Sequence, residues 1–261
     1  MTAQSDKAAA FRALHEGDAF IIPNPWDAGS ARVLQALGFR ALATTSSGFA
    51  FTLGRADGAA TLDEVVEHTR ALAAATDLPI SVDLENGYGQ APEDAARAIE
   101  RAAEAGAVGG SIEDWDAQAG LYDRGHAVER VAAACEAAAR LPFPFTVTAR
   151  AENHIRGVRD LDDTIARLRG YEEAGAHVVY APGLGDGGQV RAVCEVVTTP
   201  VNVLAHPGLS MAEVVAAGAR RVSVGGALAW VAAAALGEAA RRLRNDGDFS
   251  VLAARAPAME G

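Results

Sequence analysis

The chain has 261 residues, of which 50% are hydrophobic and 22% are charged, and its formal net charge is −11 at pH 7. A chain of this length can bury a core large enough to fold without disulfide bonds or a structural metal. The negative charge repels phosphate backbones and anionic lipid surfaces, so we expect neither nucleic acid nor a membrane as a partner. Residues 1–10 lack the apolar stretch of a signal peptide and no membrane-spanning run follows, so we expect a cytoplasmic protein.

Short apolar segments alternate with longer Ala-rich segments of helical periodicity along the whole chain. The predicted strands are Ala19–Ile22, Ala41–Thr45, Ile80–Leu84, Gly109–Ile112, Phe145–Ala149, His177–Tyr180, Val201–Leu204 and Arg221–Val224. Predicted helices between them include Thr61–Ala75, Pro92–Ala105, Ala127–Arg140, Leu161–Ala174 and Met211–Ala217. Strands that are apolar throughout and joined by helices are parallel and covered on both faces. We therefore predict an α/β fold, a single (β/α)8 TIM barrel over residues 1–261, with an open doubly wound sheet as the alternative.

Polar residues follow several predicted strands at their carboxyl ends, where barrel enzymes place their catalytic groups. Asp83 and Glu85 have the same parity on one strand, and Glu113 ends the neighbouring strand at a matching level, so we expect the three carboxylates to converge. An oxygen-rich cluster of this kind suits Mg²⁺ or Mn²⁺. The alternative is that these acids pair with arginines or cap the following helices.

Arg150 is expected at the same rim, directly after the strand that contains Thr146–Ala149. Its planar guanidinium could hold a substrate carboxylate through two hydrogen bonds, or it could form an ion pair with Glu113 or Glu152. Residues Ser46, Ser47 and Gly48 could add hydrogen-bond donors for an oxyanion, or simply shape a turn.

Three further features have a plain structural interpretation beside a functional one. His206, His154 and His126 are possible proton carriers, but a single histidine at a rim is as often a packing residue. Gly183–Gly188 matches G-x-G-x-x-G, yet it falls in the sixth unit and is interpreted as a barrel loop rather than a dinucleotide site. Cys135 and Cys194 fall inside amphipathic helix patterns at a spacing unlike that of a zinc site, which predicts core residues.

Taken together, these motifs resemble those of the isocitrate lyase/phosphoenolpyruvate mutase superfamily over roughly residues 11–245. The resemblance rests on the segments Asn24–Arg32, Ser46–Phe49, Gly54–Asp57, Val82–Gly89, Ser111–Asp114 and Ala149–Glu152. It implies a barrel of the phosphoenolpyruvate/pyruvate type and a homo-oligomer, a dimer or a tetramer. The last helical segment, about 227–261, would pack on a partner subunit or be exchanged with it.

The resemblance also implies the contents of the site. Mg²⁺, with Mn²⁺ as a possible substitute, would be held by Asp83 directly and by Glu85, Asp57 and Glu113 mainly through water. The substrate would be a small 2-oxo or 2-hydroxy acid that reacts through a metal-stabilised enolate. The expected substrate-binding residues are Ser46, Ser47, Gly48, Phe49, Arg150 and Asn202.

The segment Trp115–His126 departs from the superfamily pattern and leaves the reaction open. Lyases of this superfamily carry Lys-x-Cys-Gly-His there, and the phosphonate enzymes use a lysine and an asparagine, but this segment contains no lysine, cysteine or asparagine. The leading interpretation is therefore a Mg²⁺-dependent lyase or decarboxylase of a small mono- or dicarboxylic acid such as oxaloacetate. Arg150 would act on the substrate, and Tyr122, Asp123, His126 or His206 would supply a proton. The alternatives are a P–C bond enzyme acting on phosphonopyruvate or phosphoenolpyruvate, and a barrel that binds metal and anion without turnover.

Overall fold

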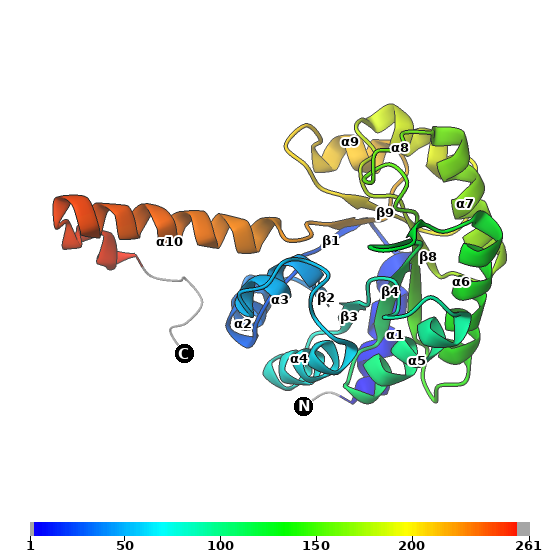
Figure 1. Cartoon of the computed structure of the whole chain (residues 1–261), viewed down its shortest axis with the longest axis horizontal. Coiled ribbons are helices and arrows are strands. Elements are labelled where there is room, and N and C mark those ends of the chain that lie inside the picture. Colours follow the sequence, from blue (N-terminus) through cyan, green and yellow to red (C-terminus); the bar gives the residue numbers. More distant parts are fainter. Residues whose placement is uncertain (1–2, 255–261) are drawn as a thin grey trace.

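The computed structural model describes residues 3–254 and confirms the predicted barrel (Figure 1). Eight parallel strands form one sheet in the order β1-β10-β9-β8-β7-β4-β3-β2. They are β1 (Phe20–Ile22), β2 (Leu42–Ala43), β3 (Ile80–Asp83), β4 (Gly109–Glu113), β7 (Thr146–Arg150), β8 (Val178–Tyr180), β9 (Val201–Leu204) and β10 (Arg221–Ser223). Each predicted strand overlaps one of these.

Helices surround the sheet and connect its strands, as Figure 1 shows. They are α1 (Gln4–Glu16), α2 (Ala28–Ala36), α3 (Ser46–Thr52), α4 (Leu62–Ala75), α5 (Pro92–Glu104), α6 (Arg124–Ala139), α7 (Leu161–Glu173), α8 (Gly187–Cys194), α9 (Met211–Ala216) and α10 (Ala227–Asp246), followed by the 3₁₀ helix η1 (Phe249–Ala253). α8 begins at Gly187, whose cap Asp186 accepts hydrogen bonds from the amides of Gly188 and Gln189. The glycine-rich segment is thus a barrel loop that ends in a helix cap.

Asn24 closes the barrel at the seam between β1 and β2. Its side-chain amide donates to the carbonyl of Thr44 at 2.8 Å, and its carbonyl oxygen accepts from the amide of Val224 at 2.9 Å. A further bond runs from the amide of Ala43 to the carbonyl of Pro23 at 3.1 Å. A short β2 can complete the barrel because this buried side chain replaces missing ladder bonds.

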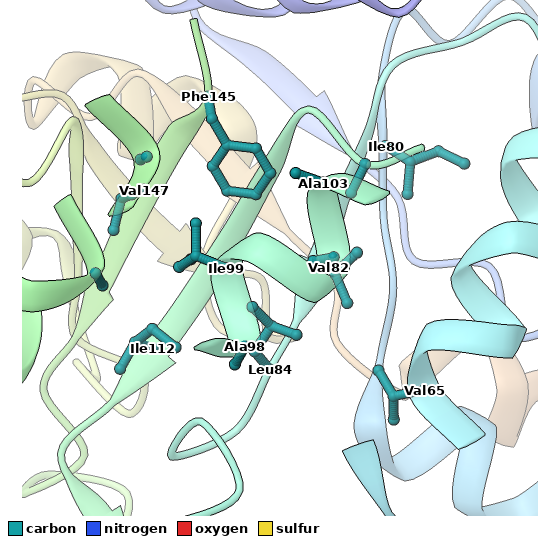
Figure 2. Packing of buried hydrophobic residues seen from close by; sticks show 14 of the residues in the cluster. Val65, Ile80, Val82, Leu84, Ala98, Ile99, Ala103, Ile112, Phe145 and Val147 are labelled. Atoms are coloured by element: carbon teal, nitrogen blue, oxygen red, sulfur yellow. The ribbon is translucent and has the colours of Figure 1, made fainter. Parts of the chain in front are cut away.

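The core lies between the strands and the apolar faces of the helices. Figure 2 shows Val82 of β3, Ile112 of β4 and Val147 of β7 together with Ala98 and Ile99 of α5. The small alanines let α5 lie close to the sheet, and this layer fixes the strands whose carboxyl ends carry the polar groups. Cys135 and Cys194 are partly buried against the core, in agreement with their predicted packing role.

The C-terminal helix α10 extends away from the barrel (Figure 1). Of its residues only Ala229 is buried, whereas Trp230, Val231 and Leu236 are more than half exposed. Residues 255–261 of the predicted C-terminal segment lie outside the described part of the chain. No helix among residues 3–254 is long and apolar enough to cross a membrane.

Candidate active site

A cavity of about 700 Å³ opens at the carboxyl ends of β3, β4 and β7. A second cavity of about 60 Å³ lies deeper, inside the barrel. Arg150, the last residue of β7, lines both. Polar groups of the outer cavity include Ser46, Asp57, Glu85, Asn86, Tyr88, Glu113, Trp115, Asp116 and Arg156. Asp83 faces the inner cavity together with Asn24, Tyr180, Asn202 and Arg221.

Asp83 and Glu85 are brought together by a turn rather than by the alternation of a strand. β3 ends at Asp83, and Glu85 has a left-handed backbone with φ of 48°. The amide of Glu85 donates to Oδ1 of Asp83 at 3.3 Å, and the amide of Glu113 donates to the carbonyl of Glu85 at 2.9 Å. The predicted proximity is present, but the same-parity argument behind it is wrong, because the strand ends before Glu85.

Arg150 lies among the predicted carboxylates. Its Nη1 is 3.2 Å from Oε2 of Glu113 and 3.5 Å from Oδ1 of Asp83, and its Nε donates to Oε1 of the fully buried Glu152. The ion pairs with Glu113 and Glu152 that the sequence left as an alternative are therefore present. Arg150 and Glu113 are paired residues at the ends of β7 and β4, so the register of these two strands creates the Arg150–Glu113 contact.

Glu85 and Glu113 are electrostatically unfavourable as anions in this structure. Burial, reinforced by the charges of Asp83 and Asp57, raises the pKa of Glu85 to about 7. Burial likewise raises the pKa of Glu113 well above its ordinary value, although Arg150 opposes that shift. Burial therefore disfavours the ionised form of both glutamates at this rim.

Ser46–Phe49 form the first turn of α3 and not an irregular loop. The amide of Ser46 donates to Oδ2 of Asp83 at 3.2 Å, and Ser46 lines the outer cavity. Ser47 lies against Gly226, while a Cβ on Gly48 would come within 2.6 Å of Thr45, so that position requires glycine. Phe49 stacks on His68 with ring centroids 4.0 Å apart and lines neither of these two cavities.

Neither cavity is lined by the four residues predicted to supply a proton, Tyr122, Asp123, His126 and His206. Oδ1 of Asp123 caps α6 by accepting from the amide of Gly125 at 2.9 Å. Nδ2 of the cavity residue Asn86 donates to the hydroxyl of the buried Tyr122 at 3.1 Å. Nε2 of His126 donates to the carbonyl of Gln90 at 2.8 Å. Nδ1 of His206 accepts from the amide of Gly208 at 3.1 Å. Tyr122 is thus connected to the cavity through one side chain, whereas the two histidines have local backbone partners.

Asn202 lies in the inner cavity in a fixed orientation. Its Oδ1 accepts from Nε of Arg221 at 2.8 Å, and its Nδ2 donates to the hydroxyl of Ser223 at 3.0 Å. Arg221 is buried and also donates to Thr148 at 3.0 Å. The predicted substrate-binding residue therefore faces the barrel interior below Arg150.

Several residues of the outer cavity, Arg156 and Trp115 among them, were not among the predicted site residues. Arg156 follows β7 after a short turn, and Trp115 begins a hairpin of β5 (Trp115–Asp116) and β6 (Gly120–Leu121). The guanidinium carbon of Arg156 is 3.5 Å from the centroid of the Trp115 ring. The signals in the sequence were a second arginine six residues after Arg150 and the position of Trp115 at the start of the segment that departs from the superfamily pattern.

The donor type at this rim suits a divalent cation, although the side chains are not gathered around one point. Among residues 3–254, no three Asp, Glu, His or Cys side chains are close enough together to enclose a metal ion. The available donors are carboxylate oxygens, the ligand type that Mg²⁺ takes in proteins. Asp83, Glu85, Asp57 and Glu113 are the residues that would hold it.

A barrel with acids and arginines gathered at the carboxyl ends of its strands defines an enzyme for small polar substrates. Residues 11–244 match the family model described as phosphoenolpyruvate phosphomutase. The chain therefore belongs to this family, within the phosphoenolpyruvate mutase/isocitrate lyase superfamily of lyases and mutases that act on small carboxylates.

Known proteins of the superfamily cover most of the chain. A structure from Burkholderia cenocepacia, provisionally described as a lyase/mutase, is 54% identical, with a TM-score of 0.94 over 97% of this chain and 94% of that one. The structure of 2,3-dimethylmalate lyase is 29% identical, with a TM-score of 0.84 over 94% of this chain and 89% of that one. Oxaloacetate decarboxylase of Rhodopseudomonas palustris is 32% identical over 84% of this chain and 77% of its own length.

Proposed function

We propose that this chain is a Mg²⁺-dependent carbon–carbon lyase or decarboxylase of a small 2-oxo or 2-hydroxy acid. The observation that carries the proposal is Arg150, which lies between Asp83 and Glu113 and lines both cavities. The relatives named for 2,3-dimethylmalate and oxaloacetate act on acids of this class.

Arg150 is the residue proposed to orient the substrate carboxylate, with Ser46 beside it at the start of α3. Ser47 and Gly48, in the same turn as Ser46, and Asn202 of the inner cavity complete the proposed substrate-binding set. Phe49 is not included, because it stacks on His68 and lines neither cavity. Mg²⁺ held by Asp83, Glu85, Asp57 and Glu113 would supply a Lewis acid for the negative charge that develops on the substrate's carbonyl oxygen.

Decarboxylation of a 2-oxo dicarboxylate illustrates the chemistry that these residues support. The bond from the carbon next to the carbonyl to its carboxylate breaks, CO₂ leaves, and the electron pair forms an enolate. One proton then returns to that carbon. Of Tyr122, Asp123, His126 and His206, we favour Tyr122 as the proton carrier, because its hydroxyl is hydrogen-bonded to Asn86, which lines the cavity.

The test is a Mg²⁺-dependent screen of oxaloacetate, substituted malates, methylisocitrate and phosphonopyruvate with direct detection of products. Asp83→Ala should lower turnover of the accepted substrate by at least about a hundredfold, since it removes the proposed direct ligand of the metal. Asp63→Ala, on the exposed face of α4, is the matched control and should leave turnover unchanged. Full Mg²⁺-dependent activity in Asp83→Ala would contradict the proposal.

Two alternatives are separated by the same screen. The family model supports phosphorus–carbon chemistry, which would show as phosphate release from phosphonopyruvate or its conversion to phosphoenolpyruvate. A barrel that only binds would be stabilised against heat by Mg²⁺ and oxalate, as any ligand-binding protein is, but would form no product.

A further inference from the structure

The outer cavity contains a second arginine, Arg156, that the proposed chemistry does not use. Its side chain is 36% exposed, compared with 16% for Arg150, so it lies at the more open part of the site. Its guanidinium lies over the ring of Trp115, at 3.5 Å from the centroid. A contact this close restricts the guanidinium to one plane while leaving its edge available for hydrogen bonds.

Arg150 and Arg156 are held next to each other by two shared carboxylates. Glu152 accepts from Nε of Arg150 with one oxygen and from Nε of Arg156 with the other, the latter at 3.0 Å. Glu113 has Oε2 at 3.2 Å from Arg150 and Oε1 at 3.6 Å from Arg156. The two arginines and two glutamates are formally neutral as a group, and each glutamate contacts both arginines.

Nη1 of Arg156 forms no hydrogen bond with any group of residues 3–254, whereas Nε and Nη2 contact the shared glutamates. A guanidinium edge of this kind, beside a polar cavity and adjacent to a second arginine, can accept another anionic group. An acid held by Arg150 at one end would extend within the same cavity toward Arg156.

The β5–β6 hairpin, which carries Trp115, is hydrogen-bonded to the rest of the site. Oδ1 of Asp116 accepts from the amides of Gln118 and Ala119, which shapes the turn of the β5–β6 hairpin. Oδ2 of Asp116 accepts from Nδ2 of Asn86 at 2.9 Å, which ties the hairpin to the segment after β3. Trp115 is therefore held in place by the same turn that shapes the outer cavity, and Arg156 is preorganised on it.

We propose that Arg156, supported by Trp115, binds a second carboxylate of the substrate and so selects dicarboxylic over monocarboxylic acids. This inference rests on the proposed function, because it assumes that the other end of the same acid occupies the site at Arg150. A phosphonate in the distal position would present the same negative charge, and the experiment separates the two groups.

The experiment compares three stable 2-hydroxy acids with Mg²⁺ present. Malate carries a distal carboxylate, 3-phosphonolactate a distal phosphonate, and 2-hydroxybutyrate no distal charge. Dissociation constants are measured by calorimetry for the wild type, Arg156→Gln and Arg156→Lys. In Arg156→Gln, malate should bind about tenfold more weakly or worse, as expected for the loss of a charge-assisted hydrogen bond. Binding of 2-hydroxybutyrate should stay within twofold, and Arg156→Lys should retain part of the malate affinity.

Two further variants test whether the effect belongs to this arrangement. Arg159→Gln removes an exposed arginine of the same segment that lines neither cavity, and it should change no affinity. Trp115→Leu removes the aromatic face and should weaken malate selectively, whereas Trp115→Phe should retain most of the affinity. Thermal melting of each variant shows whether it folds.

Equal losses for malate and 2-hydroxybutyrate in folded Arg156→Gln would overturn the inference while leaving the proposed function standing. A larger loss for 3-phosphonolactate than for malate would also overturn it, since the distal group would then be a phosphonate. If the wild type binds none of the three hydroxy acids with Mg²⁺, both the proposed function and this inference fail.

Discussion

At the scale of one residue, the position of Glu85 in the site lowers the stability of the fold. Its backbone is left-handed, and burial of its carboxylate, together with the nearby acids Asp83 and Asp57, raises its pKa to about 7. Tyr88, which also has a positive φ of 61°, donates its hydroxyl to Oε1 of Glu85 at 3.2 Å. Two non-glycine residues in this conformation within one turn indicate that local strain is tolerated for the placement of the site.

The raised pKa predicts a pH-dependent cost that Glu85→Gln should remove. An unfolded glutamate ionises near pH 4.5, whereas folded Glu85 keeps its proton to about pH 7, so folding takes up a proton between these values. Stability contributed by this group therefore falls as pH rises through that window. At pH 8 in EDTA, Glu85→Gln should be more stable than the wild type by up to about 3 kcal/mol, measured by urea unfolding.

Two controls define this prediction. Glu67→Gln, on the exposed face of α4, should show no such gain at any pH. At pH 4 the wild type and Glu85→Gln should have similar stabilities, because the wild-type carboxyl is then protonated in both states. A Glu85→Gln variant no more stable than the wild type at pH 8 would refute the assigned shift.

At the scale of elements, two neighbouring acids have different roles: Glu113 is the last residue of β4, and Asp114 follows it directly. Glu113 lies toward Arg150 and Arg156 in the outer cavity. Asp114 is directed outward to α7, where Arg167 contacts its Oδ2 at 3.0 Å and the hydroxyl of Tyr171 donates to the same oxygen. The end of β4 therefore places one acid in the site and directs the next one to a helix that it attaches to the barrel.

Asp114→Ala should destabilise the fold by about 3–5 kcal/mol, because it leaves the buried Arg167 guanidinium without its partner on the sheet. The matched control is Glu67→Ala, which breaks an exposed pair with Arg70 on α4 and should cost less than about 1 kcal/mol. Urea unfolding followed by far-ultraviolet circular dichroism measures both. A similar small cost for the two variants would show that Asp114 does not anchor α7.

At the scale of the whole molecule, α10 is exposed along its length and points away from the barrel (Figure 1). Trp230, Val231, Leu236 and the following Phe249 are 51%, 64%, 69% and 74% exposed. A run of exposed apolar side chains on one projecting element is typical of an association surface. We propose, as the superfamily resemblance implies, that α10 packs on a second copy of this chain or is exchanged with it in a dimer or tetramer.

Leu236→Glu should shift the protein toward monomers, because it places a charge among the apolar side chains of that surface. Sedimentation equilibrium over a range of concentrations measures the change. Glu238→Gln, an exposed position on the same helix, should leave the oligomer intact. A wild-type protein that is monomeric at all concentrations would contradict the proposal.

The barrel could be predicted from the sequence because its information is local. Apolar segments such as Val201–Leu204 and helices that end near glycine can be recognised from periodicity and turn residues alone, because these signals do not depend on distant contacts. The strand ends likewise carry Asp83, Glu113 and Arg150, and the topology of a barrel places those ends on one face.

Only the tertiary structure decided how these residues meet. The pairing of β4 with β7 gives Arg150 its contact with Glu113, and the left-handed turn at Glu85 follows from packing that no alternation pattern records. Arg156 reaches Trp115 across two loops that are distant in sequence. Local sequence patterns therefore determined the barrel and the residues at its rim. The partners of those side chains depended on contacts between separate segments, which form only when the strands take their register.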